Sequence, residues 1–185
     1  NYEFDGISKT IDVPFDDRQE NAFRGIIWYL GKGNPKSVYD NKIIDILASS
    51  KNSEDKIWFL PQNVVDFKNT TNATSNDCCF NSLDLPDSWL CYDFKDIRVI
   101  PTHYSLRTNS WNAKGWYHPL SWRIESSDDF KSWQFLDQQN NVTEMDDSGV
   151  IKSFQTLDTG KSFRYLRIIQ TGKNSHDNYC LTFSA

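Results

Sequence analysis

The sequence of 185 residues has little of what membrane-spanning or nucleic-acid-binding proteins need. No stretch approaches the ~18 consecutive apolar residues of a transmembrane helix, so no membrane span is expected. The net charge of −5 offers no basic surface for phosphates, so no nucleic-acid partner is expected. The sequence also lacks a C-x-x-C pair, an H-E-x-x-H motif, a G-x-S-x-G motif and a glycine-rich phosphate loop. The common metal, hydrolase and nucleotide motifs are thereby excluded, and no cofactor is expected.

Cysteine is scarce, and the four that occur are Cys78, Cys79, Cys91 and Cys180. Adjacent cysteines are poorly placed for a common disulfide, and the overall spacing is not that of a disulfide framework. Reduced thiols favour a cytoplasmic location, with a secreted or cell-surface location as the alternative. The alternative is supported by three N-glycosylation sequons, which arise easily by chance in an Asn-rich sequence and begin at Asn69, Asn72 and Asn141.

Aromatic residues are plentiful, with 12 Phe, 8 Tyr and 7 Trp, and this composition favours strands over helical bundles. Within residues 119–139, alternation places Trp122 and Ile124 on one face of a strand. A polar turn follows, and Trp133 and Phe135 then share one face of a second strand. Many short segments of this kind, separated by turns, predict an all-β sandwich of the jelly-roll type. The residues assigned to its core are Trp89, Trp122, Trp133, Tyr165 and Leu166.

A short helix is expected near the N-terminus, because apolar residues recur at helical spacing at Phe23, Ile26, Ile27 and Leu30. The residues that can cap its two ends are Asp16 or Asp17 and Gly31 or Gly33. No repeat, low-complexity linker or change in composition marks a second domain. We therefore expect one domain over residues 1–185, with a strand and helix extension over 1–35 and the β-sandwich over 36–185.

Several motifs follow one another in a familiar order: Gln62–Asp66 (QNVVD), Ser88–Phe94 (SWLCYDF), Tyr104–Arg107 (YSLR), Ser121–Asp128 (SWRIESSD) and Phe163–Arg167 (FRYLR). Together they resemble the discoidin family, the coagulation-factor C-type domains with the galactose-binding-like fold. The sequence is most similar to an intracellular branch in protist proteins and in ubiquitin-ligase or BTB-type adaptors. Secreted members join cysteines at the two ends of the domain, and this sequence has only Cys180 near an end.

The resemblance implies that the ligand lies on loops gathered at one end of the sandwich. The segments that map to these loops are 31–41, 51–88, 108–118 and 172–178. The third loop combines aromatic rings with amides and a histidine, a combination that suits a sugar or a protein hot spot. The candidate ligand-binding residues are Arg107, Asn109, Trp111, Asn112, Trp116, His118, Lys173, His176 and Asn178. Core packing by the two tryptophans and an ion pair at Arg107 are the competing interpretations.

A calcium site is the one metal candidate, because family members use an N-x-x-D loop that Asn63 and Asp66 match. The glycine that usually follows this aspartate is replaced by Phe67, which disfavours the tight turn of a carbonyl cage. We therefore expect no bound metal.

The expected function is a non-catalytic recognition module that binds a protein partner or substrate through the loops at one end. The alternative is a glycan-binding, lectin-like module. A glycoside hydrolase with paired carboxylates is a more distant alternative, because the paired aspartates of this sequence lie in turn-like clusters. The chain is expected to act as a monomeric domain of a larger protein.

Overall fold

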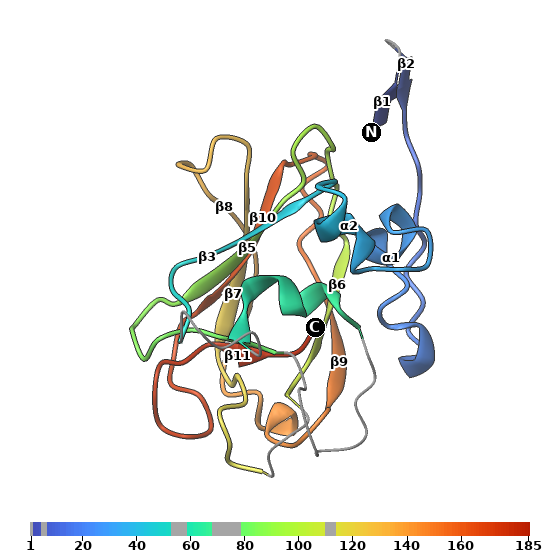
Figure 1. Ribbon diagram of the computed structural model, residues 1–185. Coiled ribbons are helices and arrows are strands. Elements are labelled where there is room, and N and C mark those ends of the chain that lie inside the picture. The colour runs from blue at the N-terminus through green and yellow to red at the C-terminus, as the bar shows by residue number, and fades with distance from the viewer. Residues whose placement is uncertain (1, 5–6, 53–58, 68–78, 110–113) are drawn as a thin grey trace.

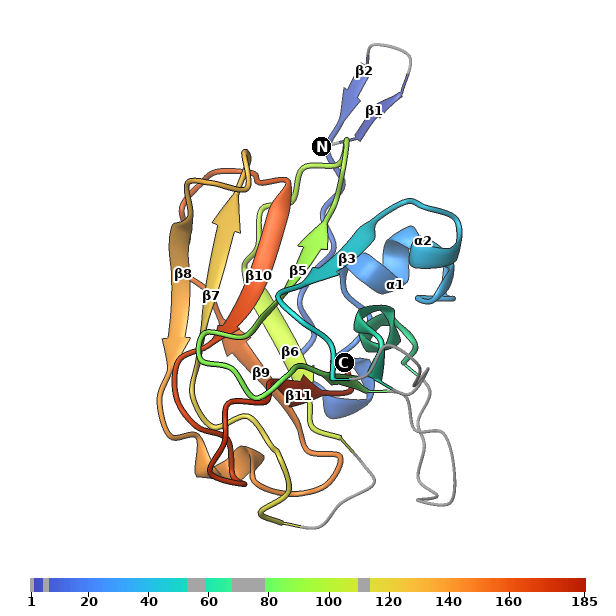
Figure 2. The ribbon, with the colours of Figure 1, turned by 60° about the vertical axis from the view of Figure 1, so that its left-hand side comes forward.

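The computed structural model describes residues 2–4, 7–52, 59–67, 79–109 and 114–185. Its largest sheet has five antiparallel strands in the order β3-β5-β10-β7-β8. Their bounds are Asp45–Ala48 (β3), Trp89–Asp93 (β5), Tyr165–Gln170 (β10), Trp122–Ser127 (β7) and Gln134–Gln139 (β8). Figures 1 and 2 show this sheet as one layer of a sandwich.

The opposite layer is built from two strand pairs, β6-β9 and β4-β11. Their bounds are His103–Arg107 (β6), Ile151–Gln155 (β9), Phe80–Asn81 (β4) and Thr182–Phe183 (β11). One cluster of buried side chains joins the layers, since it includes Leu90 and Trp122 of the large sheet together with Leu106 and Phe183 of the opposite layer. The architecture is therefore the all-β sandwich that the sequence predicts.

The inner face of the large sheet follows from alternation and register. Ile168 in β10 pairs with Leu90 on one side and with Ile124 on the other, which places three buried aliphatic side chains in a row. Trp122 is fully buried, and its indole Nε1 donates a 2.8 Å hydrogen bond to the Tyr104 hydroxyl of β6. That hydroxyl in turn donates to Asp137 in β8 at 2.6 Å. A polar network thus links the two layers inside the core.

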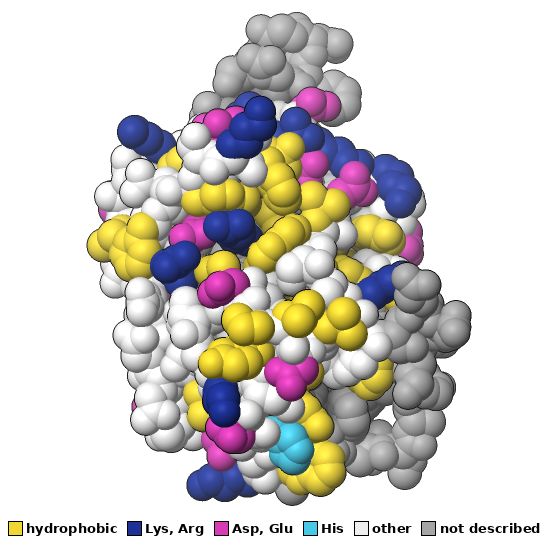
Figure 3. Space-filling model, turned by 90° about the vertical axis from the view of Figure 1, so that its left-hand side faces the viewer, with side chains coloured by type: hydrophobic (Ala, Val, Ile, Leu, Met, Phe, Trp, Pro, Cys, Tyr) yellow, Lys and Arg dark blue, Asp and Glu magenta, His cyan; other side chains and the backbone are white. Residues whose placement is uncertain are grey.

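The outer face of the large sheet carries three aromatic side chains that the sequence assigned to the core. Trp89 and Tyr165 both contact Phe130, with ring centroids 5.8 and 5.2 Å apart. Trp133 also contacts Phe130, and the Arg167 guanidinium lies 3.7 Å from the Trp133 ring centroid. These rings are partly exposed, because they cover the side of the sheet that faces solvent. Figure 3 shows hydrophobic side chains interspersed with charged ones on the side of the molecule that it presents. The prediction of a core position was correct for Trp122, and Leu166 packs against the core.

The β7-β8 hairpin contains a shift in register between Ile124 and Glu125. This bulge changes which side chains of β8 face inward, so Leu136 is fully buried whereas Phe135 is 40% exposed. The expected apolar face of β8 was therefore the wrong one.

The N-terminal segment contains the strands β1 (Tyr2–Phe4) and β2 (Ile7–Lys9), the short helix η1 (Gln19–Asn21) and the helices α1 (Ile26–Leu30) and α2 (Ser37–Asp40). Helix α1 is shorter than expected and begins after Gly25, and Asp16 instead bonds to Arg18. Gly31 ends the helix as expected. A Cβ at this glycine would collide with the Asn34 carbonyl. Leu30 belongs to the core cluster, so this segment packs onto the sandwich.

Two short helices remain, η3 (Pro61–Val65) and η4 (Thr143–Met145). No helix in the described part of the chain is long and apolar enough to cross a membrane.

The described cysteines are buried. Burial, together with the charge of Asp93, raises the pKa of Cys91 to about 12. Burial likewise raises the pKa of Cys180 to about 11. Both thiols therefore stay protonated near neutral pH and are unreactive as nucleophiles. Cys78 lies outside the described residues.

Candidate binding site at the loop end

Two loops that are far apart in sequence meet at the end of the sandwich opposite to β1 and β2, as Figure 1 shows. The first joins β6 to β7 over residues 108–121, of which 110–113 lie outside the described residues. The second follows β10 over residues 171–181. Backbone hydrogen bonds and short polar side chains hold each loop in place.

The first loop is held against the segment that precedes β9. The Thr108 hydroxyl donates to the Asp147 carbonyl at 2.6 Å and accepts from the Val150 amide at 2.8 Å. Asp146 Oδ1 accepts a 2.8 Å hydrogen bond from the Gly115 amide. Tyr117 has a positive φ of 61°, a conformation that non-glycine residues adopt only where the surroundings impose it. This turn presents Trp116 at the surface.

Asn174 organises the second loop. Its side-chain oxygen accepts from the His176 amide at 2.9 Å, and its side-chain nitrogen donates to the Cys180 carbonyl at 2.8 Å. The same nitrogen donates to Asn178 Oδ1 at 2.7 Å. Asn174 is almost fully buried, so these bonds replace those that its amide would make to water. The loop tip is therefore fixed from within.

The two loops are joined by direct hydrogen bonds. The His118 amide donates to the Ser175 hydroxyl at 3.0 Å, and the Ser175 amide donates to the His118 carbonyl at 3.0 Å. His176 Nδ1 lies 3.3 Å from the Gly115 carbonyl oxygen, within hydrogen-bond distance. These contacts bring the rings of the two loops together.

The result is a cluster of three rings. The His176 ring lies 5.5 Å from the Trp116 ring at an interplanar angle of 23°, and 4.4 Å from the Tyr117 ring at 34°. Trp116 is 46% exposed, and His176 is exposed beside it. Figure 3 shows a histidine next to hydrophobic side chains at this end of the molecule. An exposed indole supported by a second ring is a platform for a flat apolar surface.

Charged groups lie next to the cluster. Lys173 Nζ and Asp177 Oδ1 form an exposed ion pair at 3.0 Å. The hydrogen bond and the negative charge of Asp177 raise the pKa of Lys173, so the amine remains a cation near neutral pH. Amine and carboxylate supply a donor and an acceptor to a hydroxylated ligand.

No family model and no curated protein matches this chain. Several solved structures, however, superpose on this chain. CpGH89CBM32-5 of Clostridium perfringens, solved with GalNAc-β-1,3-galactose, superposes with a TM-score of 0.58 at 12% identity over 77% of this chain and 92% of its own. The fold is galactose-binding-like.

Two further solved structures share this galactose-binding-like fold. A fucolectin from the serum of striped bass, Morone saxatilis, superposes with a TM-score of 0.57 at 11% identity over 77% of this chain and 45% of its own. A chitosan-binding module of a Paenibacillus sp. IK-5 chitosanase/glucanase superposes with a TM-score of 0.52 at 16% identity over 76% of this chain and 93% of its own. At these identities the comparison establishes the fold and leaves the intracellular branch and the adaptor role as predictions.

The galactose-binding-like domain places the predicted site residues in two different settings. Trp116 and His176 are brought together at the surface, and Lys173 pairs with Asp177, the residue that follows His176. Asn109, His118 and Asn178 support the loops from within: the first two are fully buried, and the third bonds to the Asn174 side chain. Trp111 and Asn112 lie outside the described residues.

Arg107 is only 8% exposed at the end of β6, so its position is structural. Its Nε donates to the Ser184 hydroxyl at 2.9 Å, and its backbone amide donates to the Ala185 carbonyl at 2.7 Å. The guanidinium carbon lies 5.6 Å from the Phe23 ring centroid. In this position Arg107 ties the C-terminal residues and the N-terminal segment to the sandwich, and it does not join the exposed rings.

Sequence reasoning missed Tyr117 as a member of the ring cluster and Asn174 as the residue that fixes the second loop. The signal for Asn174 was its place two residues before His176, the spacing at which an asparagine side chain accepts a backbone amide. For Tyr117 the chain offers no local signal, because its partner ring lies on another loop.

The calcium candidates lie in and beside η3. The Asn63 side-chain nitrogen donates to the Cys79 carbonyl at 3.2 Å, and the Asp66 backbone amide closes the turn on the Asn63 carbonyl. Asn63 is nearly buried and serves as a bridge between two segments. Among the described residues, no three His, Cys, Asp or Glu side chains are gathered to hold a metal ion.

Proposed function

We propose that this galactose-binding-like domain is a non-catalytic glycan-binding module whose sugar packs against Trp116 at the loop end. The supporting observation is an indole that is 46% exposed and backed by the His176 ring. A pyranose has an apolar face of C–H groups that stacks on such a ring, and burying this face on the indole stabilises the complex. Lys173 and Asp177 stand nearby and offer a donor and an acceptor for hydroxyl groups.

The comparisons favour a glycan over a protein partner. The neighbours include a module solved with a disaccharide, a fucolectin and a chitosan-binding module. The protein-partner function expected first from the sequence has no comparable support. A binding role without catalysis agrees with these neighbours, which are two binding modules and a lectin.

The proposal is tested by screening the protein on an array of mammalian, plant and microbial glycans, followed by titration calorimetry with the best ligand. We expect dissociation constants between ~1 μM and ~1 mM, the range of modest binding free energies. Trp116→Ala removes the platform and is expected to weaken binding at least about tenfold, as loss of an aromatic anchor does.

The matched control is Phe135→Ala, which removes an exposed ring from the outer face of β8, away from the loop end. It is expected to leave the affinity unchanged. Equal loss in both variants, or no glycan bound anywhere on the array, would contradict the proposal. A glycan bound with full affinity by Trp116→Ala would place the site elsewhere.

A further inference from the structure

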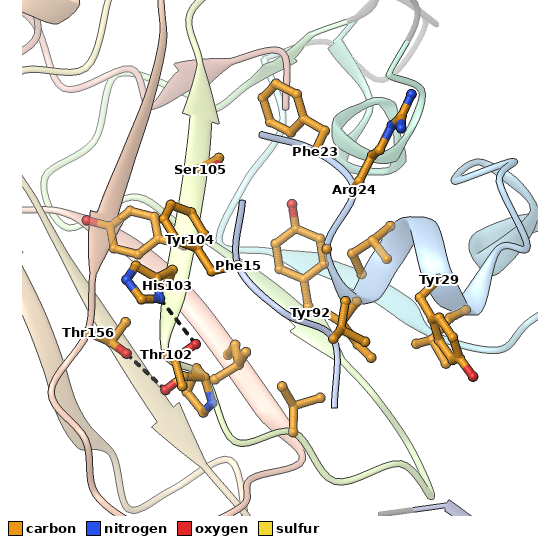
Figure 4. A pocket seen from close by; sticks show the side chains of 18 of the residues that line it. Phe15, Phe23, Arg24, Tyr29, Tyr92, Thr102, His103, Tyr104, Ser105 and Thr156 are labelled. Carbon is orange, nitrogen blue, oxygen red and sulfur yellow. Dashed lines mark hydrogen bonds between the residues drawn. The ribbon is translucent and has the colours of Figure 1, made fainter. Parts of the chain in front are cut away.

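A cavity of about 520 Å³ lies between the N-terminal segment and the sandwich, well away from the ring cluster. Residues 10–29 form one wall, and the other wall is formed by the inner faces of β5 and β6 and the connection between them. Figure 4 shows side chains from the two walls pointing toward one another. The volume is within the ~300–1,000 Å³ that small-molecule pockets usually have.

The walls are predominantly apolar. Ile11 and Val13 line the cavity from the extended part of the N-terminal segment, and both are partly buried. Val99 and Leu166 line it from the sandwich and pack against the main core. Phe15 lies flat on the His103 ring, with centroids 4.0 Å apart and an interplanar angle of 5°. A ligand that fills this space exchanges water for apolar contact, which favours an apolar molecule.

The charged side chains at the cavity either have a partner or are exposed to solvent. Arg167 forms a 2.6 Å ion pair with Glu125, and Asp16 is bonded to Arg18. Arg98 Nε lies 3.7 Å from Asp128 Oδ1, and Asp12 and Arg24 are exposed. A charged ligand would lose its hydration without gaining a dedicated partner from these residues, so an uncharged ligand is favoured.

The tyrosine and threonine hydroxyls at the cavity differ in whether they have a hydrogen-bond partner within the protein. Tyr104 is committed to Asp137, and Thr156 donates to the Pro101 carbonyl at 2.9 Å. The Tyr92 hydroxyl, by contrast, has no hydrogen-bond partner among the described residues. Figure 4 shows the Tyr92 side chain projecting from its strand toward Phe23. An unmatched donor inside an apolar space costs free energy unless a ligand or water satisfies it.

We propose that this cavity is a second binding site, for a small uncharged apolar molecule whose carbonyl or ether oxygen accepts a hydrogen bond from Tyr92. The apolar walls select the body of the ligand, and the phenol fixes its orientation. Burial raises the pKa of Tyr92 above its usual range, so the phenol remains a donor at neutral and mildly alkaline pH. The site is independent of the glycan-binding proposal, since the two share no residue.

The test uses prodan, an uncharged naphthalene dye with one carbonyl group, titrated into the full chain. Its emission brightens in an apolar site and shifts with hydrogen bonding to the carbonyl. We expect saturable binding in the wild type. Tyr92→Phe keeps the ring and removes the donor, so affinity should fall about 2- to 10-fold, the loss expected for one hydrogen bond, and the emission should shift to the blue. Tyr165→Phe removes a hydroxyl from the outer face of the large sheet and is expected to change neither the affinity for the dye nor its emission.

A second variant separates the cavity from other apolar surfaces. Ile11→Trp fills the space from the N-terminal segment and is expected to abolish dye binding. Trp116→Ala is expected to retain dye binding whether or not it loses glycan binding. Circular dichroism and thermal unfolding establish that each variant is folded. Saturable binding that survives Ile11→Trp, no binding to the wild type, or an affinity and emission that Tyr92→Phe leaves unchanged would each overturn the proposal.

Discussion

Trp122 links the two layers of the sandwich in two ways, because its ring packs in the core and its indole nitrogen donates a hydrogen bond. Its ring meets the Phe154 ring edge to face, with centroids 5.3 Å apart. Its indole nitrogen starts the chain of hydrogen bonds through Tyr104 to Asp137. Burial raises the pKa of Tyr104 above its usual range, and its hydrogen bond to Asp137 adds to this shift, so the phenol remains the donor in this chain.

We predict that Trp122→Ala lowers the free energy of unfolding by about 3–5 kcal/mol, because it leaves a cavity in the core and removes the hydrogen bond that the Tyr104 hydroxyl accepts. Urea denaturation followed by circular dichroism measures the change. Trp116→Ala serves as the control, since this ring is nearly half exposed, and it should cost less than about 1 kcal/mol. Equal losses in the two variants would place Trp122 outside the core.

At the residue scale, the sequence predicted part of the candidate site. Trp116 and His176 were identified because an aromatic ring and a histidine in polar loops suit ligand binding, and the structure brings them into contact. Arg107 and His118 have the same chemistry but point into the fold. Whether a polar side chain in a loop or at the end of a strand faces solvent depends on contacts with distant segments, such as Ser184 for Arg107, and the local sequence carries no signal for these contacts.

At the element scale, the polar turn between β7 and β8 is held in one conformation by hydrogen bonds to the Asp129 side chain. Asp129 Oδ1 accepts hydrogen bonds from the amides of Ser132 at 2.7 Å and Lys131 at 2.8 Å. The Ser127 hydroxyl also donates to it at 3.0 Å. These hydrogen bonds, that of the Ser132 amide first, lower the pKa of Asp129 well below its ordinary value of 3.8. The aspartate thereby helps to fix the turn that carries Phe130 onto the outer face.

We predict a pH dependence that belongs to this turn. Because the folded pKa of Asp129 is depressed, its contribution to stability is present above pH 3.8 and is lost as the pH falls below that value. Asp129→Asn should lower the unfolding temperature at about pH 6, and the difference from wild type should shrink at about pH 2. Thermal unfolding across this range measures both.

The control for this prediction is Asp17→Asn, which changes an exposed aspartate outside the hairpin. It should leave the unfolding temperature nearly constant relative to wild type at both pH values. A difference between Asp129→Asn and wild type that does not depend on pH would show that the carboxylate charge is not what stabilises the turn.

Elements were predicted well where alternation was regular and poorly where the chain departs from it. The segment Trp122–Ser127 is the strand that alternation indicated. In β8 the bulge reverses the inward face, and nothing in the regular alternation of Ile124 and Glu125, between which the register shifts, indicates it. The apolar stripe around Phe23 predicted a longer helix, but only Ile26–Leu30 is helical, because Phe23 instead contacts Phe67 and Arg107.

At the scale of the whole molecule, β1 and β2 lie at the end opposite to the loop end, and the rest of the N-terminal segment runs along the flank of the sandwich, as Figure 1 shows. The all-β, galactose-binding-like architecture was predicted correctly, because short strand motifs in a fixed order carry that information. The apolar stripe at residues 23–30 predicted a segment packed against one end of the sandwich, and Leu30 does belong to the core cluster. The sequence did not indicate which surface residues 10–22 cover, so the cavity behind the segment was missed.

We predict that the N-terminal segment unfolds together with the sandwich. Deleting residues 1–30 removes Leu30 from the core and uncovers the apolar wall of the cavity. The unfolding temperature should fall by at least about 5 °C, given the free energy of burying one large aliphatic side chain and the usual dependence of this temperature on stability. Scanning calorimetry measures the change.

A shorter deletion provides the control. Removing residues 1–9 takes away only β1 and β2, and the unfolding temperature should change by no more than about 2 °C. If both truncated proteins have the unfolding temperature of the wild type, the N-terminal segment does not unfold cooperatively with the sandwich, and the prediction is wrong.

The bulge between β7 and β8 also affects how copies of the protein meet in solution. Strand β8 is one edge of the large sheet, and such an edge can recruit a strand from another copy. Here the edge is twisted by the bulge and carries the charge of Asp137 and the polar side chains of Gln134, Gln138 and Gln139. Addition of a further strand would be irregular and would place these groups against a neighbour. The bulge is therefore expected to disfavour edge-to-edge association of two copies.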